Sequence, residues 1–321
     1  MKLVVTIDTE EDNWGNSSLA AYTLENIARI PAIQQLFDDF NVKPTYLLTY
    51  PVAACEKSVA ILRELLEAGK CEIGSQCHPW NTPPLEEEKI KSNSMLCNLP
   101  ADLQYSKLLA LHETIHKNFD IEPVSFRSGR WGYSQDVARN LHRIGYKIDT
   151  SITPYTDWTH IYGRDFSHMS PRPFRFSIED VFQESSKGQL VEVPVTIGYI
   201  GCLNWHSALG GAILKLIKRK PINSLRLDGI LYRLNLMKKV WLSPEVSDAA
   251  NMIKLIEQMM KRQYQVINMV FHSSSLTHGL TPFVRTKEEE KRFFERIKAV
   301  LTFTRESGID PIKLSDVPRL I

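Results

Sequence analysis

The sequence has 321 residues, of which 43% are hydrophobic and 24% are charged, and its formal net charge is +2. This composition is typical of a soluble globular chain of one or two domains, and the small net charge indicates no particular partner. A membrane-spanning helix is not expected, because no run of about eighteen apolar residues occurs.

Strands and helices alternate along most of the chain. The predicted strands cover residues 3–7, 44–49, 71–76, 124–126, 146–152, 190–198, 265–271 and 310–314, and the predicted helices cover 24–40, 58–68, 102–119, 135–144, 247–262 and 287–306. This alternation predicts a mainly parallel sheet with covering helices, and about eight strands favour a closed or nearly closed barrel. No G-x-G-x-x-G or P-loop motif is present, which argues against the usual nucleotide-binding folds.

Two stretches interrupt the alternation. Residues 154–189 are rich in proline and aromatic side chains, and we expect them to cap the barrel mouth. Residues 201–244 form a predicted basic helical insertion, in which 211–240 holds eight Lys or Arg residues against one Asp, a net charge of +7 (8 − 1). Such a stretch could lie on an anionic membrane or bind phosphates. The alternative is a solvated helical face packed on the barrel. Basic and aromatic residues do not alternate in it, so a nucleic-acid partner is not expected.

Polar residues with catalytic chemistry fall where predicted strands end. They are Asp8 and Glu10 after the first strand, His78 after the third, Arg127 and Arg130 after the fourth, Asp149 near the end of the fifth, and His272 after strand 265–271. Active sites of β/α barrels are built at the carboxyl ends of the strands. Two carboxylates close together raise each other's pKa, a conflict that a bound cation relieves. We therefore expect a site here, although a solvated acidic loop would also explain the first cluster.

Six stretches carry a family resemblance. They are TIDTEED (6–12), EIGSQCHPWNTPP (72–84), SFRSGRWGY (125–133), YKIDTSITP (146–154), VEVPVTIG (191–198) and MVFHSSSLTHGLTPFV (269–284). In this order they resemble the polysaccharide deacetylase superfamily, the NodB-homology or carbohydrate esterase family 4 group, and within it the WalW-like branch of bacterial surface-polysaccharide gene clusters. The resemblance implies that residues 1–321 form a single α/β domain, a distorted (β/α)7 barrel. It also implies a divalent metal, usually zinc, and hydrolysis of the N-acetyl group of an amino sugar.

The resemblance assigns catalytic roles to five positions. Asp8 matches the general base, and Arg127 matches the arginine that orients it. His272 matches the general acid, and Asp149 matches an acidic position that holds that histidine. Tyr133 lies where a backbone N–H helps to form the oxyanion hole.

The expected metal site departs from the family pattern. Thr9 stands where the metal-binding aspartate is expected, and Glu10, on the same strand face as Asp8, could replace it. Gln76 stands where the first of two histidines is expected, so that only His78 remains. Glu10, His78 and Gln76 are therefore the candidate ligands. This set is weaker than a carboxylate with two histidines, because catalytic zinc usually has about three good protein ligands.

The loops at the barrel mouth carry candidate substrate-binding residues, namely Trp80, Arg130, Trp131 and Tyr133. The aromatic rings could stack on sugar rings, or they could anchor the loops that carry them.

The resemblance implies a metal-dependent hydrolase that removes an N-acetyl group from an amino sugar in a precursor of a bacterial surface polysaccharide or lipopolysaccharide. The precursor would be a saccharide or a sugar linked to a nucleotide or a lipid. No signal peptide is recognisable and the five cysteines form no C-x-x-C pair, so we expect a cytoplasmic protein. The alternatives are a barrel that has lost its metal and only binds a glycan or a partner, and a hydrolase of another non-peptide C–N bond.

Overall fold

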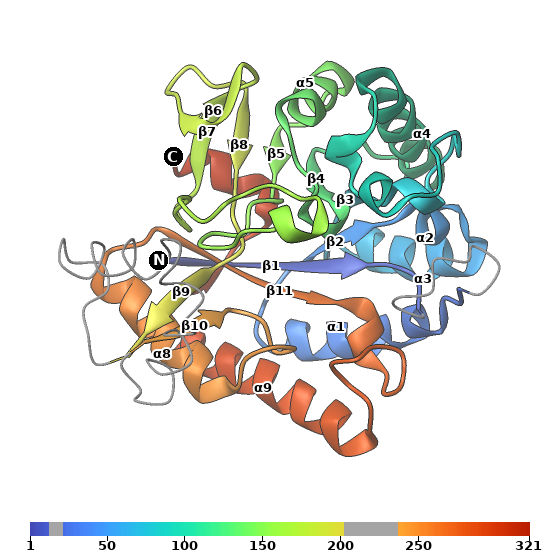
Figure 1. Ribbon diagram of the computed structural model, residues 1–321. Coiled ribbons are helices and arrows are strands. Elements are labelled where there is room, and N and C mark those ends of the chain that lie inside the picture. Colours follow the sequence, from blue (N-terminus) through green and yellow to red (C-terminus); the bar gives the residue numbers. More distant parts are fainter. Residues whose placement is uncertain (13–21, 202–236) are drawn as a thin grey trace.

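The computed structural model describes residues 1–12, 22–201 and 237–321 (Figure 1). Seven strands form a parallel run in the order β11, β1, β2, β3, β4, β5 and β8. Their bounds are Val266–His272 (β11), Lys2–Thr9 (β1), Thr45–Leu48 (β2), Glu72–Cys77 (β3), Ser125–Ser128 (β4), Ile148–Asp149 (β5) and Leu190–Glu192 (β8). The predicted parallel α/β architecture is confirmed.

Irregular chain segments bring the two ends of this parallel run together. The strands β8 and β11 are not paired with each other, so the sheet is not closed as a ladder. However, the Thr196 N–H donates to the Asn268 carbonyl at 3.1 Å, and the Val270 N–H donates to the Leu242 carbonyl at 3.1 Å. Thr196 follows β8, whereas Asn268 and Val270 belong to β11. The result is a distorted barrel of seven parallel strands.

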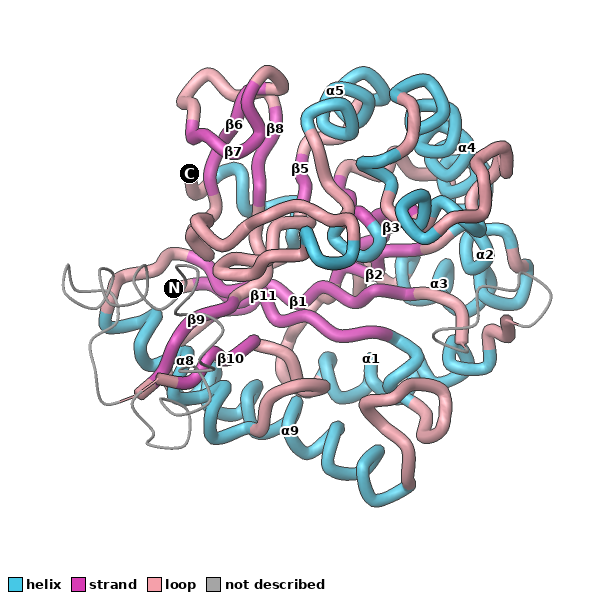
Figure 2. Tube along the Cα trace, in the orientation of Figure 1, coloured by secondary structure: helices cyan, strands magenta, loops and turns pink. Residues whose placement is uncertain are grey.

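Helices surround the strands (Figure 2). The α-helices are α1 (Ile30–Asp38), α2 (Tyr50–Ala54), α3 (Glu56–Glu67), α4 (Ala101–Phe119), α5 (Gln135–Ile144), α8 (Ala249–Lys261) and α9 (Lys287–Glu306). Short 3-10 turns cover Glu25–Arg29, Pro79–Asn81, Lys91–Ser94, Leu96–Asn98, Gly129–Trp131, Thr159–Ile161, Ser273–Leu276 and Leu314–Arg319. Each predicted helix that lies in the described residues is present; 135–144 and 287–306 match α5 and α9 at both ends, and the others have shifted ends.

Local chemistry sets several helix ends. The hydroxyl of Thr286 accepts a hydrogen bond from the Glu289 N–H, and Glu289 bonds back to the Thr286 N–H, which together form a capping box at the start of α9. At the start of α5, the Ser134 hydroxyl accepts a hydrogen bond from the Val137 N–H. Helix α5 ends at Gly145, whose φ of 120° lies in the left-handed region that favours glycine.

Three smaller pieces extend the barrel. The hairpin of β6 (Phe174–Ser177) and β7 (Asp180–Glu184) pairs antiparallel with β8 and lies in the predicted 154–189 insertion. The strands β9 (Ile197–Ile200) and β10 (Lys238–Trp241) form a separate antiparallel ribbon. The short β12 (Asp310–Pro311) pairs with the start of β1. Most of the predicted basic insertion, residues 202–236, lies outside the described residues.

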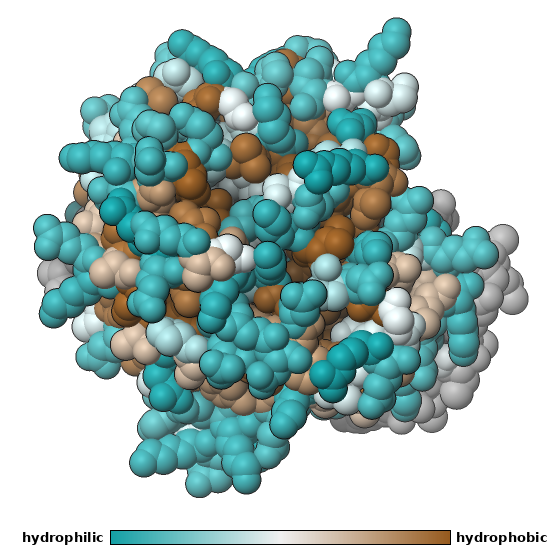
Figure 3. All heavy atoms as spheres, turned by 180° about the vertical axis from the view of Figure 1, so that it is seen from behind, coloured by the Kyte–Doolittle hydropathy of each residue, from teal (hydrophilic) through white to brown (hydrophobic). Residues whose placement is uncertain are grey.

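The apolar side of these elements forms the core. Fully buried side chains from β1, β2 and β4, including Ile7, Tyr46 and Phe126, belong to one large hydrophobic cluster to which α1, α3, α4, α5, α8 and α9 also contribute. Seen from the back, hydrophilic side chains cover much of the outer surface and hydrophobic ones show in patches between them (Figure 3). Among the described residues, none of the helices has the length and apolarity that a membrane crossing requires.

Candidate active site

Parallel pairing brings three of the predicted site residues together. Asp8 lies in register with His272 on the neighbouring strand β11, and Arg127 reaches Asp8 from β4. All three lie at or near the carboxyl ends of their strands, which is the end of a β/α barrel that carries active sites.

The guanidinium of Arg127 is fixed at every nitrogen. Its Nη1 donates to Oδ1 of Asp8, its Nη2 donates to the hydroxyls of Thr6 (2.8 Å) and Thr150 (3.0 Å), and its Nε donates to the Thr150 carbonyl (2.9 Å). Arg127 is completely buried, and Asp8 is 2% exposed. A buried charge is tolerated only when it is paired and hydrogen-bonded, and both conditions are met here. The network holds the Asp8 carboxylate in one orientation.

The imidazole of His272 lies between two carboxylates. Its Nδ1 is 3.0 and 3.1 Å from the two oxygens of Glu245, and its Nε2 is 3.6 Å from Oδ2 of Asp8. Glu245 also accepts hydrogen bonds from the His272 N–H (3.0 Å) and from the Ser275 hydroxyl. Burial alone would lower the pKa of His272, but the carboxylates of Glu245, Glu10 and Asp8 raise it to about 10. The surrounding carboxylates thus favour the imidazolium form of His272, which can donate a proton.

Glu245 takes the role that the family resemblance implied for Asp149. The contacts of Asp149 are instead with the Ser151 N–H (3.1 Å), the Ser151 hydroxyl (2.7 Å) and the neighbouring Glu192. Burial raises the pKa of Asp149, and burial together with the Asp149 carboxylate raises that of Glu192 well above its ordinary value. Asp149 thus belongs to a buried carboxyl pair inside the barrel, and the expectation that it holds His272 is corrected.

Glu10 and Gln76, two of the candidate metal ligands, lie close to a ring nitrogen of the third, His78. The Nε2 of His78 is 3.5 Å from Oε2 of Glu10 and 3.4 Å from Nε2 of Gln76. All three side chains are buried, and Oε1 of Gln76 has no hydrogen-bond partner. Burial is the largest influence on the Glu10 carboxyl and raises its pKa to about 7.

Two of the three ligand-to-ligand distances match a zinc site if the Gln76 amide is rotated by 180°. Two ligand atoms about 2.1 Å from a tetrahedral zinc are about 3.4 Å from each other, which matches both distances measured at His78. The rotation would place Oε1, an oxygen donor now without a partner, where Nε2 lies. Within residues 1–12, 22–201 and 237–321, no three His, Cys, Asp or Glu side chains are placed to hold a metal, so a site here would need the Gln76 amide as its third ligand.

The predicted substrate-binding residues have different environments. Trp80 stacks on His78, with ring centroids 4.3 Å apart, and Trp131 lies under the Arg127 guanidinium and 6.1 Å from Trp241. Arg130 is exposed and donates to the Ser94 hydroxyl at 2.7 Å. Both Arg130 and Trp131 have a left-handed backbone, with φ of 54° and 63°, a strain that is often found at functional sites.

Tyr133 does not match its expected role. Its side chain is completely buried and packs edge-on against Phe176 of β6, so it is a core residue rather than a substrate contact. Its backbone N–H, which the resemblance placed in the oxyanion hole, donates to the Trp131 carbonyl at 2.9 Å. The expectation for Tyr133 is corrected on both counts.

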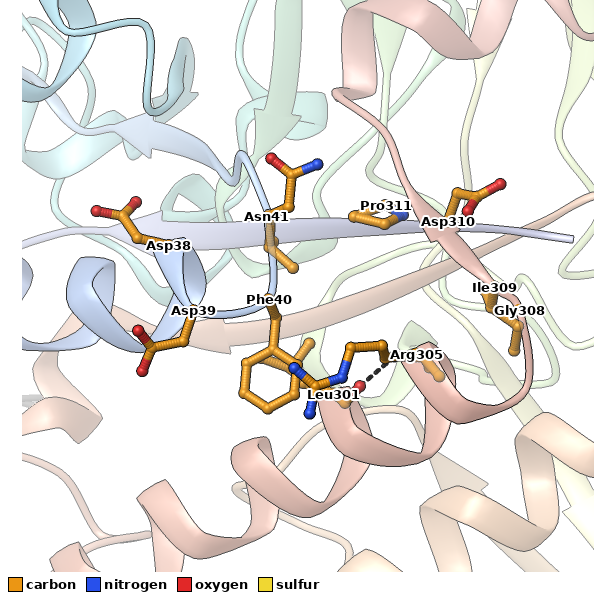
Figure 4. Close-up of a pocket in the computed structure, with 12 residues that line it drawn as sticks. Asp38, Asp39, Phe40, Asn41, Leu301, Arg305, Gly308, Ile309, Asp310 and Pro311 are labelled. Atoms are coloured by element: carbon orange, nitrogen blue, oxygen red, sulfur yellow. Dashed lines mark hydrogen bonds between the residues drawn. The ribbon is translucent and has the colours of Figure 1, made fainter.

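A pocket of about 330 Å³ lies elsewhere, between the end of α1 and the end of α9 (Figure 4). Its lining includes Asp310 and Pro311, which pair with the first residues of β1. It therefore lies toward the amino end of β1, whereas Asp8 lies near the carboxyl end. We assign no catalytic role to this pocket.

Comparisons with known proteins bear on the fold. No family model matches the chain, and no curated protein matches it. The structure resembles a protein from Parabacteroides distasonis provisionally described as a glycoside hydrolase/deacetylase, with a TM-score of 0.61, 11% identity, and coverage of 99% of this chain and 70% of that one. It also resembles the 4-alpha-glucanotransferase of Thermococcus litoralis, with a TM-score of 0.56, 11% identity, and coverage of 100% of this chain and 40% of that one.

A provisional polysaccharide deacetylase from Mycobacterium smegmatis matches with a TM-score of 0.47 and 14% identity, over 97% of this chain and 93% of that one. Identities this low speak for shared architecture only. The two matches with a TM-score above 0.5, together with the parallel run of seven strands, confirm the predicted distorted β/α barrel.

Proposed function

We propose that the protein is a carbohydrate deacetylase that hydrolyses the N-acetyl group of an amino sugar. The observation that supports this proposal most is the position of His272 between Glu245 and the Asp8–Arg127 pair. It provides a proton donor and a carboxylate 3.6 Å apart at the carboxyl end of the barrel. Amide hydrolysis needs both groups, because a water must lose a proton and the departing amine must gain one.

The two groups have separate tasks. Asp8, held by Arg127, accepts the proton of the attacking water. His272 enters the reaction protonated and gives its proton from Nε2 to the amine nitrogen as the C–N bond breaks. Glu245 holds Nδ1 on the opposite side of the ring, so that Nε2 faces Asp8 and the space where the substrate would lie.

We further propose that a divalent metal, most simply zinc, is held by Glu10, His78 and Gln76. When bound, such an ion would polarise the acetyl carbonyl and make water a better nucleophile at neutral pH. The support for this site is the spacing of the three side chains around the His78 Nε2 and the unpartnered oxygen of Gln76.

The proposed substrate is a saccharide, or a sugar on a nucleotide or lipid carrier, from the synthesis of a bacterial surface polysaccharide or lipopolysaccharide. A cytoplasmic location is part of this proposal. It is supported by Cys55, Cys71, Cys77 and Cys97, which are free thiols in the structure. Contact of the 211–240 stretch with a membrane stays a prediction, because most of it lies outside the described residues.

The test is an amine-release assay on N-acetylglucosamine oligosaccharides with zinc added. Wild type should release amine and acetate, and His272→Asn should lower the rate by about 10²–10⁴-fold, the usual contribution of a general acid. His278→Asn is a matched control, because His278 also pairs with a glutamate, Glu290, but lies away from Asp8. An equal loss of amine-release rate in His272→Asn and His278→Asn would contradict the proposal. If wild type and His278→Asn released no amine from any N-acetylated sugar tested, the proposal would also fail, and a barrel that only binds glycans would be favoured.

A further inference from the structure

The ring of His78 is packed on both faces and has a carboxylate near each nitrogen, although Nδ1 has no direct hydrogen bond. Trp80 stacks on one side at 4.3 Å, and a Cβ at Gly129 would come within 1.9 Å of the His78 Cδ2, so the backbone of Gly129 abuts the ring. Nε2 faces Glu10 and Gln76, whereas Nδ1 is 3.5 Å from Oε1 of Glu11. Glu11 therefore lies on the side of the ring opposite the proposed metal.

Glu11 is itself fixed by two neighbours. Its Oε1 accepts a hydrogen bond from the Asn81 amide at 2.6 Å, and its Oε2 accepts one from the Thr49 hydroxyl at 3.1 Å. Asn81 is the last residue of the 3-10 turn after His78, and Thr49 follows the end of β2. The carboxylate is buried, and three segments of the chain converge on it.

We infer that Glu11 is a positioning residue for the metal site, acting through the Nδ1–H of His78. A histidine that binds metal through one nitrogen carries its proton on the other, and a carboxylate at that proton fixes the tautomer and makes the ligand more basic. This inference rests on the proposed metal site, and neither the family resemblance nor the comparisons assign Glu11 any role.

The position of Glu11 also explains how a neutral amide can serve in this site. Gln76 contributes no charge and binds metal weakly compared with a second histidine. A second carboxylate, placed behind His78, adds negative charge next to the ligands without occupying a coordination position. Glu10 and Glu11 thus act on the same imidazole from opposite nitrogens.

The test is a Co²⁺ titration of the metal-free full-length protein, followed by the visible absorption of the bound ion. Glu11→Gln should weaken Co²⁺ binding by about 10–100-fold, the usual effect of removing such a partner, with little change in the melting temperature of the metal-free protein. Asp12→Asn is the matched control, because it removes the same charge one residue away. The Asp12 carboxylate accepts from Asn26, Thr23 and the Glu25 N–H, not from His78. Its Co²⁺ affinity should stay closer to that of wild type than the affinity of Glu11→Gln does, because the buried Asp12 carboxylate makes no contact with His78.

The outcomes separate a failure of the Glu11 inference from a failure of the proposed metal site. Equal weakening by Glu11→Gln and Asp12→Asn would show a general charge effect and overturn the inference, as would wild-type affinity in Glu11→Gln. Wild type that binds no Co²⁺ would refute the metal site itself, and the inference with it. If Glu11→Gln does not fold, Asn81→Ala removes the 2.6 Å hydrogen bond that fixes Oε1, and it should weaken Co²⁺ binding severalfold. An unchanged affinity in that variant would also overturn the inference.

Discussion

Replacing Glu245 by glutamine should change the proton affinity of His272 and the stability of the site together. The carboxylate makes two contacts with the imidazole Nδ1 and accepts from the His272 N–H and the Ser275 hydroxyl. Its side chain is 4% exposed, so its charge is poorly screened by water. Without that charge, the pKa of His272 should fall from about 10 toward its ordinary value of 6.5.

The size of the effect follows from burial. Removing one partner of a buried ion pair costs about 3–5 kcal/mol, because the remaining charge is left uncompensated. The folded-state pKa of His272 is raised, so its stabilisation is fully present below pH 6.5 and is lost as the pH rises toward about 10. The destabilisation by Glu245→Gln should therefore be largest in mildly acidic solution and small near pH 10.

Urea unfolding of both proteins at a series of pH values measures this difference. An NMR titration of the His272 ring gives the pKa directly, and the amine-release assay should show a loss of about 10²–10⁴-fold if the general acid is disabled. Glu290→Gln is the control, because Glu290 pairs with His278 on the surface side of the molecule. A His272 pKa that is unchanged in Glu245→Gln, or a destabilisation that is the same at pH 6 and pH 10, would refute the reasoning.

Three further variants test the surroundings of the site. Gly129→Ala places a Cβ 1.9 Å from the His78 ring, so it should destabilise the fold by about 1–3 kcal/mol and weaken Co²⁺ binding, which thermal melts and titration can check. Gln76→His should raise the affinity for Co²⁺ or Zn²⁺, because an imidazole is a stronger ligand than an amide, and an unchanged affinity would remove position 76 from the metal site. Lys107→Met removes the cation that pairs with the buried Glu87 and leaves three backbone carbonyls without their donor. The free energy of unfolding, measured in urea, should therefore fall by about 3–5 kcal/mol. An unchanged free energy of unfolding would show that this pair is not required.

Much of the barrel could be predicted from local sequence. The runs at 3–7 and 265–271 are rich in β-branched and apolar residues, which predicts buried strands. They appear in the structure as β1 and β11. The predicted strand 190–198 was wrong in extent. It divides into β8 and β9 around Pro194, which has no N–H to donate to a ladder.

The site was predictable only where it follows a strand end. Asp8, Arg127 and His272 were found because parallel strands bring their carboxyl ends to one place. Glu245 was missed because it lies in a loop between β10 and α8, and nothing in its neighbours indicates that the loop folds back onto His272. Tyr133 was misplaced for a similar reason, since its burial depends on Phe176, which belongs to a later hairpin.

The place of β1 in the sheet affects how the chain folds while it is being synthesised. Strand β1 has β2 as one neighbour and β11 as the other, and its Thr6 side chain bonds to Asn268, 262 residues later. One edge of β1 therefore stays open until β11 has been made, and an open edge is a template for wrong pairing. The same delay keeps His272 away from Asp8 until late in synthesis. Truncated chains that end before β11 should accordingly aggregate and carry no acid–base pair.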